Sequence, residues 1–301
     1  MRPDFPTIGT RMDALGLWDV LSRYNFAVKP RGTVFPYFCT VMKGDGKPVK
    51  ARFLMLEGWQ TLHDFVRTRI DNNFGFCSSP IEFPHFELVI LTTGEVKVFR
   101  NDPGYLPCEV VDGTDDLVSK ILWEAYGVFL RVESDPALPL RFANDRAVFA
   151  RVEEASGKWA DSPLTIPDPP PYKETITLPK DLIKSAQDLP FAADEAWELD
   201  LRILPNVMTK EARPRCVYEL LVKNGKTGET VFSSRASVTP EGGLRALWEG
   251  MPVQVLHEIV RFGKVPGASR VRSGRVFRLL RLLCLDLPLK LSLHDQLEHL
   301  R

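Results

Sequence analysis

The alternation of hydrophobic and polar positions divides the chain into two structured parts around a proline-rich stretch. Within residues 162–179, prolines stand at positions 163, 167, 169, 170, 171 and 179. Proline lacks a backbone N–H and fixes φ, so this density excludes a helix or a central strand. We expect residues 162–194 to be a stiff linker that includes a short helix at 180–187. The spacing Pro167-x-x-Pro170 also allows a polyproline ligand for a partner domain.

The first part, residues 1–161, has the pattern of an α+β domain in which hairpins and amphipathic helices alternate. Apolar residues at helical spacing predict helices over 12–24, 59–70 and 115–131. Apolar and polar runs bounded by turn residues predict strands over 37–43, 50–56, 86–92, 96–100 and 147–152. Glycine-containing turns at 44–48 and 93–94 join the first four of these strands into two hairpins. Residues 103–107, Pro-Gly-Tyr-Leu-Pro, predict a rigid turn.

The clearest strand signal of the second part, residues 195–301, lies at 197–204. Apolar and polar residues alternate there, and a period of two is typical of a half-buried strand. The elements expected after it are a hairpin at 216–223 and 229–237, a helix at 244–262 broken by Pro252, a strand at 269–272, a helix at 273–284, a strand at 287–293 and a helix at 294–301. We expect one mixed sheet with the 197–204 strand at its centre and the hairpin on one side, because crossovers between parallel strands are right-handed.

This element order resembles the ribonuclease H-like core of integrases and transposases. The likeness is carried by Trp197-x-x-Asp200, by the hairpin glycine, by residues 263–266 before a short strand, and by Gly274-x-x-Phe277. The resemblance implies an α/β ribonuclease H-like domain with a mixed sheet. The chain as a whole also resembles a family of bacterial two-domain proteins of unknown function, in which an N-terminal α+β domain precedes such a C-terminal domain. That second likeness implies an architecture and no activity.

The residue that decides what chemistry this resemblance implies is Arg272. Integrases and transposases read Ser-Asp-Asn-Gly-x-x-Phe where residues 271–277 read Val-Arg-Ser-Gly-Arg-Val-Phe. The Asp of that motif binds a catalytic metal, and Arg272 stands in its place. A cation cannot ligate Mg²⁺. The resemblance therefore implies the fold without the catalysis, and we expect no catalytic residue, no metal and no cofactor.

Carboxylates elsewhere leave a metal-dependent nuclease open as an alternative. Asp200 stands where the resemblance places a first metal ligand, and Asp295 or Glu298 is a candidate third. Two-metal catalysis needs several converging carboxylates, with ions about 4 Å apart. Glu219 lies on the strand expected beside that of Asp200, so a divergent site from Asp200, Glu219, Glu258 and Asp295 is geometrically open. Otherwise Asp200 is a polar residue on a strand.

Two shorter motifs each lack a residue that their chemistry requires. Gly225-Lys226-Thr227 ends like a phosphate-binding loop, but Leu220 replaces the first glycine and a strand follows, so we expect a hairpin turn. His257 and Glu258 begin like a zinc-protease helix, but Arg261 stands where the second histidine belongs.

Histidines and cysteines give no further site. His294 and His299 are five positions apart on the expected last helix, so they do not share a face. Cys77 and Cys108 have His85 nearby in sequence, but we expect buried structural thiols rather than a nucleophile.

A run of basic residues near the end of the chain contains no acidic residue. Three of its arginines, Arg275, Arg278 and Arg281, recur at a spacing of three, which predicts a stripe of arginines along one helix. Such a stripe could contact phosphates or an acidic partner, or be a solvated face with arginine stems over apolar surface. The candidates for phosphate or partner binding are Arg261, Lys264, Arg270, Arg272, Arg275, Arg278 and Arg281.

Composition narrows the class of protein. The 301 residues allow two separate cores, and a formal net charge of zero gives no overall attraction to nucleic acid or membranes. Five scattered cysteines suit free buried thiols in a reducing compartment. We find no signal-peptide pattern and no apolar run of the roughly 18 residues that a membrane helix needs. We expect a cytoplasmic, non-catalytic binding or regulatory protein that contacts another macromolecule, protein or nucleic acid; the alternatives are a nucleic-acid-binding protein or a divergent metal-dependent nuclease.

Overall fold

The computed structural model describes residues 4–44, 48–71, 83–111, 113, 115–142, 146–169, 176–208, 213–239 and 243–300. Backbone contacts divide the chain into two compact units, each with its own hydrophobic core. The first unit consists of Met1–Phe65, Phe83–Asp102 and Pro107–Pro170. The second consists of Val66–Glu82, Pro103–Leu106 and Pro171–Arg301.

In the described part of the first unit, eight strands form one mixed sheet with the order β6-β5-β4-β3-β2-β1-β7-β8. β1 is parallel to β7, and the other neighbouring strands are antiparallel. The strands are β1 (Phe26–Lys29), β2 (Tyr37–Lys43), β3 (Val49–Glu57), β4 (His85–Leu91), β5 (Val96–Asn101), β6 (Cys108–Glu109), β7 (Ala147–Glu153) and β8 (Trp159–Thr165). The two predicted hairpins are confirmed as β2–β3 and β4–β5, and all the strands share a single sheet.

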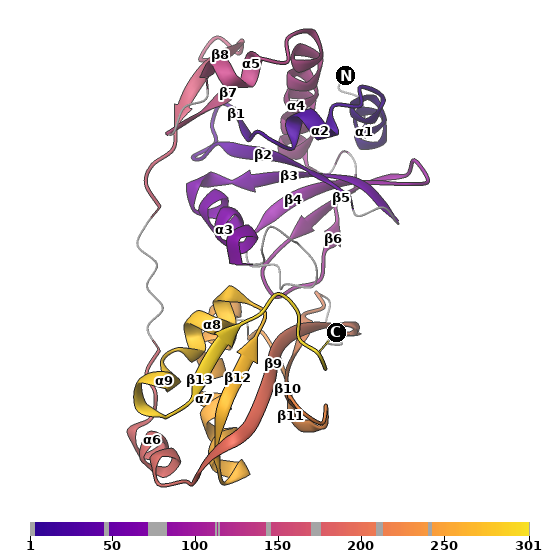
Figure 1. Cartoon of the computed structure of the whole chain (residues 1–301). Coiled ribbons are helices and arrows are strands. Elements are labelled where there is room, and N and C mark those ends of the chain that lie inside the picture. The colour runs from indigo at the N-terminus through magenta and orange to yellow at the C-terminus, as the bar shows by residue number, and fades with distance from the viewer. Residues whose placement is uncertain are drawn as a thin grey trace. The chain divides into compact units, whose positions relative to one another are not determined.

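Helices cover both faces of this sheet. In Figure 1, α1, α2 and α4 lie on one face and α3 lies on the other. The helices are α1 (Phe5–Ala14), α2 (Trp18–Leu21), α3 (Gly58–Asp71), α4 (Asp116–Ser134) and α5 (Leu138–Phe142). The core on the α4 face includes Ile8 and Met12 of α1, Phe129 of α4 and Phe53 of β3, all fully buried. The predicted helices at 59–70 and 115–131 are confirmed as α3 and α4.

The helix predicted at 12–24 is wrong in its start and in its continuity. The Asp4 side chain accepts a hydrogen bond from the Thr7 amide, so α1 begins seven residues earlier, at Phe5. Gly16 adopts a left-handed conformation with φ of 65° and separates α1 from α2. Hydrophobic spacing continues across this break because both helices cover the same core.

β1 and β8 were not predicted from the sequence. β1 has four residues, too few for periodicity to mark it, and it pairs with β7 more than 100 residues away. β8 includes Ser162 and Pro163, so the first residues of the expected linker belong to a strand. β8 is at the edge of the described sheet, where a proline is tolerated.

In the second unit, five described strands form a mixed sheet with the order β11-β10-β9-β12-β13. β10 is antiparallel to β9 and β11, whereas β12 is parallel to β9 and β13. The strands are β9 (Phe191–Met208), β10 (Cys216–Asn224), β11 (Thr230–Ser237), β12 (Val265–Val271) and β13 (Lys290–Leu293). The prediction that the strand at 197–204 is central, with the hairpin on one side, is confirmed.

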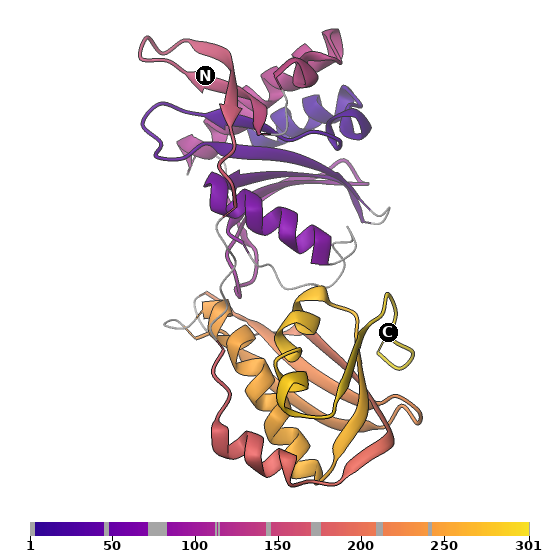
Figure 2. The same ribbon diagram turned by 60° about the vertical axis from the view of Figure 1, so that its left-hand side comes forward.

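The β9 strand separates two chemically different faces of this sheet. Trp197, Leu199 and Leu201 belong to the hydrophobic core, with buried residues of α7 and α8. Figure 2 shows α7 and α8 on this face. The helices of the unit are α6 (Lys180–Gln187), α7 (Gly243–Phe262), α8 (Gly274–Leu280) and α9 (Leu283–Asp286). The intervening residues Glu198, Asp200 and Arg202 point to the opposite side, called the polar face below.

Two predicted helix boundaries in this unit are wrong. α7 continues through Pro252, which is buried, because α7 packs Trp248, Met251 and Val255 into the core and this burial outweighs one lost hydrogen bond. The helix expected at 273–284 ends at Leu280 and resumes as α9.

The end of the described chain also differs from its prediction. Residues 294–300 form no helix. Their backbone is held instead by a side chain of the sheet, as described below. Throughout the described ranges, we find no helix with the length and apolar character that a membrane crossing requires.

Candidate functional site

Asp200 and Arg272 form an ion pair at the position where the sequence suggests a lost metal site. β12 is parallel to β9, and Val271 pairs with Leu199. Arg272, which directly follows β12, and Asp200 of β9 therefore lie side by side on the polar face. Nη2 of Arg272 lies 2.6 Å from Oδ2 of Asp200. Burial raises the pKa of Asp200, and the positive charge of Arg272 acts in the opposite direction.

Glu219 of β10 is the centre of a second ionic group on this face. It pairs across the sheet with Arg202, whose Nε and Nη2 donate to Oε2 at 2.9 and 2.7 Å. Ser233 of β11 donates to Oε1 at 2.8 Å, and Arg235 Nε lies 3.7 Å from the same oxygen. Burial alone would raise the pKa of Glu219, but these hydrogen bonds and charges lower it overall.

Glu198 of β9 holds residues 294–300, here called the C-terminal tail. Its side chain is 1% exposed, and its two oxygens accept the backbone N–H groups of Glu298 and His299 at 3.1 and 2.8 Å. Arg270 Nη1 lies 4.0 Å from the same carboxylate. Two tail residues, Leu297 and Leu300, pack against Leu221 of the polar face. The tail is thus bound to the sheet by both polar and apolar contacts.

These contacts limit what the polar face can do chemically. Asp200, Glu219 and Glu198 come from two neighbouring strands, and each faces at least one arginine within 4.0 Å. Carboxylates paired with guanidinium groups are poor metal ligands, because a metal ion would have to displace the cation. Across the described residues, no group of three or more His, Cys, Asp or Glu side chains is placed to hold a metal ion.

The four acids of the divergent nuclease alternative do not come together. Asp200 and Glu219 share the polar face. Glu258 lies on α7, which covers the opposite face, and its carboxylate pairs with Arg261 at 2.7 Å. Asp295 belongs to the C-terminal tail. The sheet itself separates Glu258 from the other three.

The seven basic candidates also occupy separate places. Arg270 and Arg272 lie on the polar face with their acidic partners, and Arg261 pairs with Glu258. Lys264 follows α7 and is exposed.

The expected arginine stripe belongs to α8 and its C-terminal cap. Arg278 and Arg281 are exposed. The Arg275 guanidinium instead lies 4.4 Å from the centroid of the Trp248 ring on α7, a cation–π contact. The stripe therefore offers two exposed arginines to solvent rather than three.

Of the remaining sequence candidates, the 225–227 motif is confirmed as a hairpin turn. Asn224 Oδ1 accepts the Lys226 and Thr227 amides at 2.8 and 3.0 Å, which closes the loop between β10 and β11. The expectation of a buried thiol is wrong for Cys108, which is exposed on β6 because this two-residue strand pairs along one side at the sheet edge. Cys77 lies outside the described residues.

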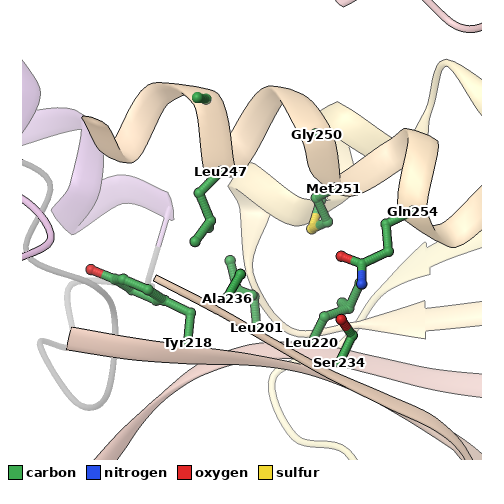
Figure 3. Close-up of a pocket in the computed structure, with 10 residues that line it drawn as sticks. Leu201, Tyr218, Leu220, Ser234, Ala236, Leu247, Gly250, Met251 and Gln254 are labelled. Carbon is green, nitrogen blue, oxygen red and sulfur yellow. The ribbon is translucent and has the colours of Figure 1, made fainter. Parts of the chain in front are cut away.

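A pocket that the sequence did not reveal lies between α7 and strands β9 to β11. Its volume is about 180 Å³. Figure 3 shows Tyr218 at one end, Gln254 and Ser234 at the other, and Leu247 of α7 between them. The lining is mainly apolar, a composition typical of pockets that receive apolar groups. Its residues come from four elements, so no single stretch of sequence carries its signal.

Comparison with known proteins adds no assignment. No protein-family model matches the chain, and neither a curated protein nor a solved structure is significantly similar to it. The function is therefore inferred from the polar face and the pocket.

Proposed function

We propose that the second unit is a ribonuclease H-like domain without a metal site, and that the protein is a non-catalytic binding or regulatory module that contacts another macromolecule. The sheet order supports the fold, because three antiparallel strands followed by two parallel ones match the element order of the resemblance. The observation that carries the functional proposal is the 2.6 Å contact between Arg272 and Asp200.

This contact opposes metal-dependent hydrolysis for an electrostatic reason. Two-metal catalysis requires carboxylates that concentrate negative charge around two cations. Here Arg272 supplies the positive charge that a metal would supply, and it cannot polarise a phosphate and activate water as a metal does. Arg202 and Arg235 act on Glu219 in the same way. The polar face is therefore a neutralised surface rather than a catalytic one.

The second unit offers a protein partner a suitable surface. β11 is an edge strand of the described sheet, and edge strands present backbone groups that an extended peptide can pair with. The pocket is lined by Ser234 and Ala236 of this strand, so a peptide paired with β11 would bring a side chain to it. We therefore favour an extended protein segment with an apolar side chain as the partner.

Nuclease assays with Mg²⁺ or Mn²⁺ test the loss of catalysis. We expect no cleavage of DNA or RNA by the purified protein. Cleavage that disappears in the Asp200→Ala variant would contradict the proposal.

A peptide library displayed on phage tests the partner. We expect enriched peptides to carry an apolar residue among β-forming residues. Gly250 of α7 lines the pocket, and a Cβ there would meet no heavy atom within 4 Å, so Gly250→Leu should fill the pocket without damage to the helix. Gly127→Leu on α4 is the matched control, because a Cβ there also meets nothing within 4 Å. Loss of peptide binding in both variants, or in neither, would contradict the proposal.

Nucleic acid is a second candidate, favoured by the exposed Arg278 and Arg281. Affinity for nucleic acid should then fall by roughly 0.7–0.9 log units per neutralised phosphate for each log unit of salt. Replacing both arginines by Ala should reduce the slope of log affinity against log salt by the amount that corresponds to about two phosphate contacts. An unchanged slope would leave the two arginines as a solvated surface.

A further inference from the structure

β11 presents two kinds of side chain at the edge of the described second-unit sheet. Ser234 and Ala236 line the pocket under α7, whereas Arg235 between them points to the polar face, opposite Glu219 of β10. The register with β10 is regular over residues 232–237. Side chains of a strand alternate between its two faces, and paired residues share a face. A segment that paired with this edge would therefore place its side chains alternately at the pocket and at the polar face.

The pocket beside β11 is apolar along its walls and polar at one end. Leu201, Leu247 and Met251 belong to the apolar walls. At the polar end, the Gln254 side chain extends from α7 toward the strand that carries Ser234 (Figure 3). Within the described ranges, neither the Ser234 hydroxyl nor the Gln254 amide is used in a hydrogen bond of the protein itself. Both groups are therefore available to a ligand, and each can donate and accept.

This lining distinguishes between side chains that are otherwise similar in size. A phenyl ring or an aliphatic side chain would contact the walls but would cover the hydroxyl and the amide without a hydrogen-bond partner, which is costly. A tyrosine has the same aromatic body and carries a hydroxyl at its far end. That hydroxyl can bond to Ser234 and Gln254 while the ring packs on Leu247 and Met251. Contact between a methionine sulfur and an aromatic ring is itself favourable.

Arg235 provides positive charge on the other face of the same edge. Its side chain is 63% exposed, and its Nε lies 3.7 Å from Oε1 of Glu219. Glu219 already accepts two hydrogen bonds from Arg202, at 2.9 and 2.7 Å. Two arginines thus face one carboxylate, so this group carries a net positive charge. In a paired segment, a residue next to the one that enters the pocket would lie beside Arg235, where an acidic side chain is favourable.

We infer that the partner segment carries a tyrosine flanked by acidic residues. This inference rests on the proposed function, because it requires an extended segment that pairs with β11. The tyrosine enters the pocket with its hydroxyl at Ser234 and Gln254, and a neighbouring Asp or Glu lies beside Arg235. A basic residue at that neighbouring position is disfavoured, because Arg235 would repel it.

Binding of a designed peptide and its altered forms to the full chain tests the inference. The reference peptide is Thr-Val-Asp-Tyr-Asp-Val-Thr, capped at both ends. Its outer residues favour strands, and an Asp on each side of the Tyr places one beside Arg235 in either strand direction. Affinities are measured by fluorescence anisotropy, in competition with a dye-labelled reference peptide.

Two changes in the peptide should each weaken binding. Replacement of Tyr by Phe removes the hydroxyl, and we expect an affinity loss of about threefold to tenfold. Replacement of both Asp residues by Asn removes the charge, and we expect a loss of about twofold to fivefold. Added salt should remove the difference between Asp and Asn, because the Arg235 side chain is exposed.

Variants assign each preference to its residues. Ser234→Ala combined with Gln254→Leu should remove the preference for Tyr over Phe. Arg235→Gln should remove the preference for Asp over Asn and leave the preference for Tyr. Gln60→Leu on α3 and Arg281→Gln after α8 are the matched controls, because both residues are exposed and neither lines the pocket. Arg235 is exposed, so its variant should fold even if the pocket variant does not.

The outcomes separate this inference from the proposed function. Equal binding of the Tyr and Phe peptides would overturn the inference, and so would a Tyr preference that persists in the pocket variant or an Asp preference that persists in Arg235→Gln. Absence of saturable binding by the reference peptide would also overturn it. The proposed function is contradicted as well only if the phage library yields no peptide whose binding is lost in Gly250→Leu.

Discussion

Arg272 Nη2 donates to Asp200 Oδ2 over 2.6 Å, across the parallel pair of strands β12 and β9. Asp200 is 4% exposed, and about a third of the Arg272 side chain is accessible. The arginine is therefore both the residue that opposes a metal and the group that compensates a buried carboxylate.

Removal of Arg272 alone should destabilise the second unit. In Arg272→Ala, Asp200 remains buried without its cation, and breaking such a pair costs about 3 kcal/mol. Urea unfolding followed by the fluorescence of Trp197 and Trp248, both in the core of this unit, measures the loss. The double variant Asp200→Leu with Arg272→Met should recover most of it, because neither charge remains. A double variant as unstable as the single one would show that the arginine acts through packing.

The second unit should lose stability in acid through Glu219. Its folded pKa is below its ordinary value of 4.5, so between the two values the unfolded chain binds more protons than the folded one. The stabilisation is present above pH 4.5 and is lost as the pH falls through the folded pKa. Urea titrations at several pH values give the free energy of unfolding at each pH. Below pH 4.5 this free energy should fall less steeply in Glu219→Gln than in the wild-type protein. Glu229 is on the exposed hairpin turn, so Glu229→Gln should leave the pH dependence of the unfolding free energy as in the wild type. Equal effects of the two changes would refute the assignment of the acid sensitivity to Glu219.

Thiol reactivity should follow exposure. In a Cys77→Ser background, Cys108 should react first with an aromatic disulfide reagent, because it is exposed. Cys284 should react more slowly, and Cys39 and Cys216 only on unfolding, because burial raises the pKa of these three thiols and reaction requires the thiolate. Mass spectrometry of quenched samples gives the order. Early labelling of Cys39 would contradict the described core.

Two glycines with similar backbone angles should tolerate alanine differently. Gly104 and Gly94 have φ of 81° and 86°. A Cβ at Gly104 would lie 2.3 Å from Val238 Cγ1, whereas a Cβ at Gly94 would meet nothing within 4 Å. Gly94→Ala should cost about 1–2 kcal/mol from its φ angle alone. Gly104→Ala should cost about 1–3 kcal/mol more, because of the clash. Equal losses in thermal unfolding would mean that Val238 moves aside freely.

Local patterns predicted much of the second sheet. The alternation from Trp197 to Ile203 indicated a central strand because one face of β9 packs on helices and the other is polar. The same pattern could not reveal the C-terminal tail, whose amides bind Glu198 about 100 residues earlier. β1 was missed for the same reason, since its pairing with β7 depends on distant residues.

The candidate site was predictable in part. The resemblance predicted a lost metal position at Arg272, but its pairing with Asp200 could be seen only from the register of β12 and β9. The Arg275 contact with Trp248 joins two helices, so a count of basic residues on one helix overstated the exposed charge. The pocket is lined by several elements, and sequence spacing does not report such convergence.

The second unit also uses a short piece of chain from far upstream. Gly104 accepts the Cys216 amide at 2.9 Å, and the Leu106 amide donates to Pro214 at 3.1 Å, at the start of β10. A gene segment that begins after the prolines would therefore encode this unit without the residues that complete its β10 end. A cut at the linker would therefore separate the second unit from two backbone hydrogen bonds at the start of β10, and the isolated C-terminal half is expected to be less stable than the same unit in the full chain.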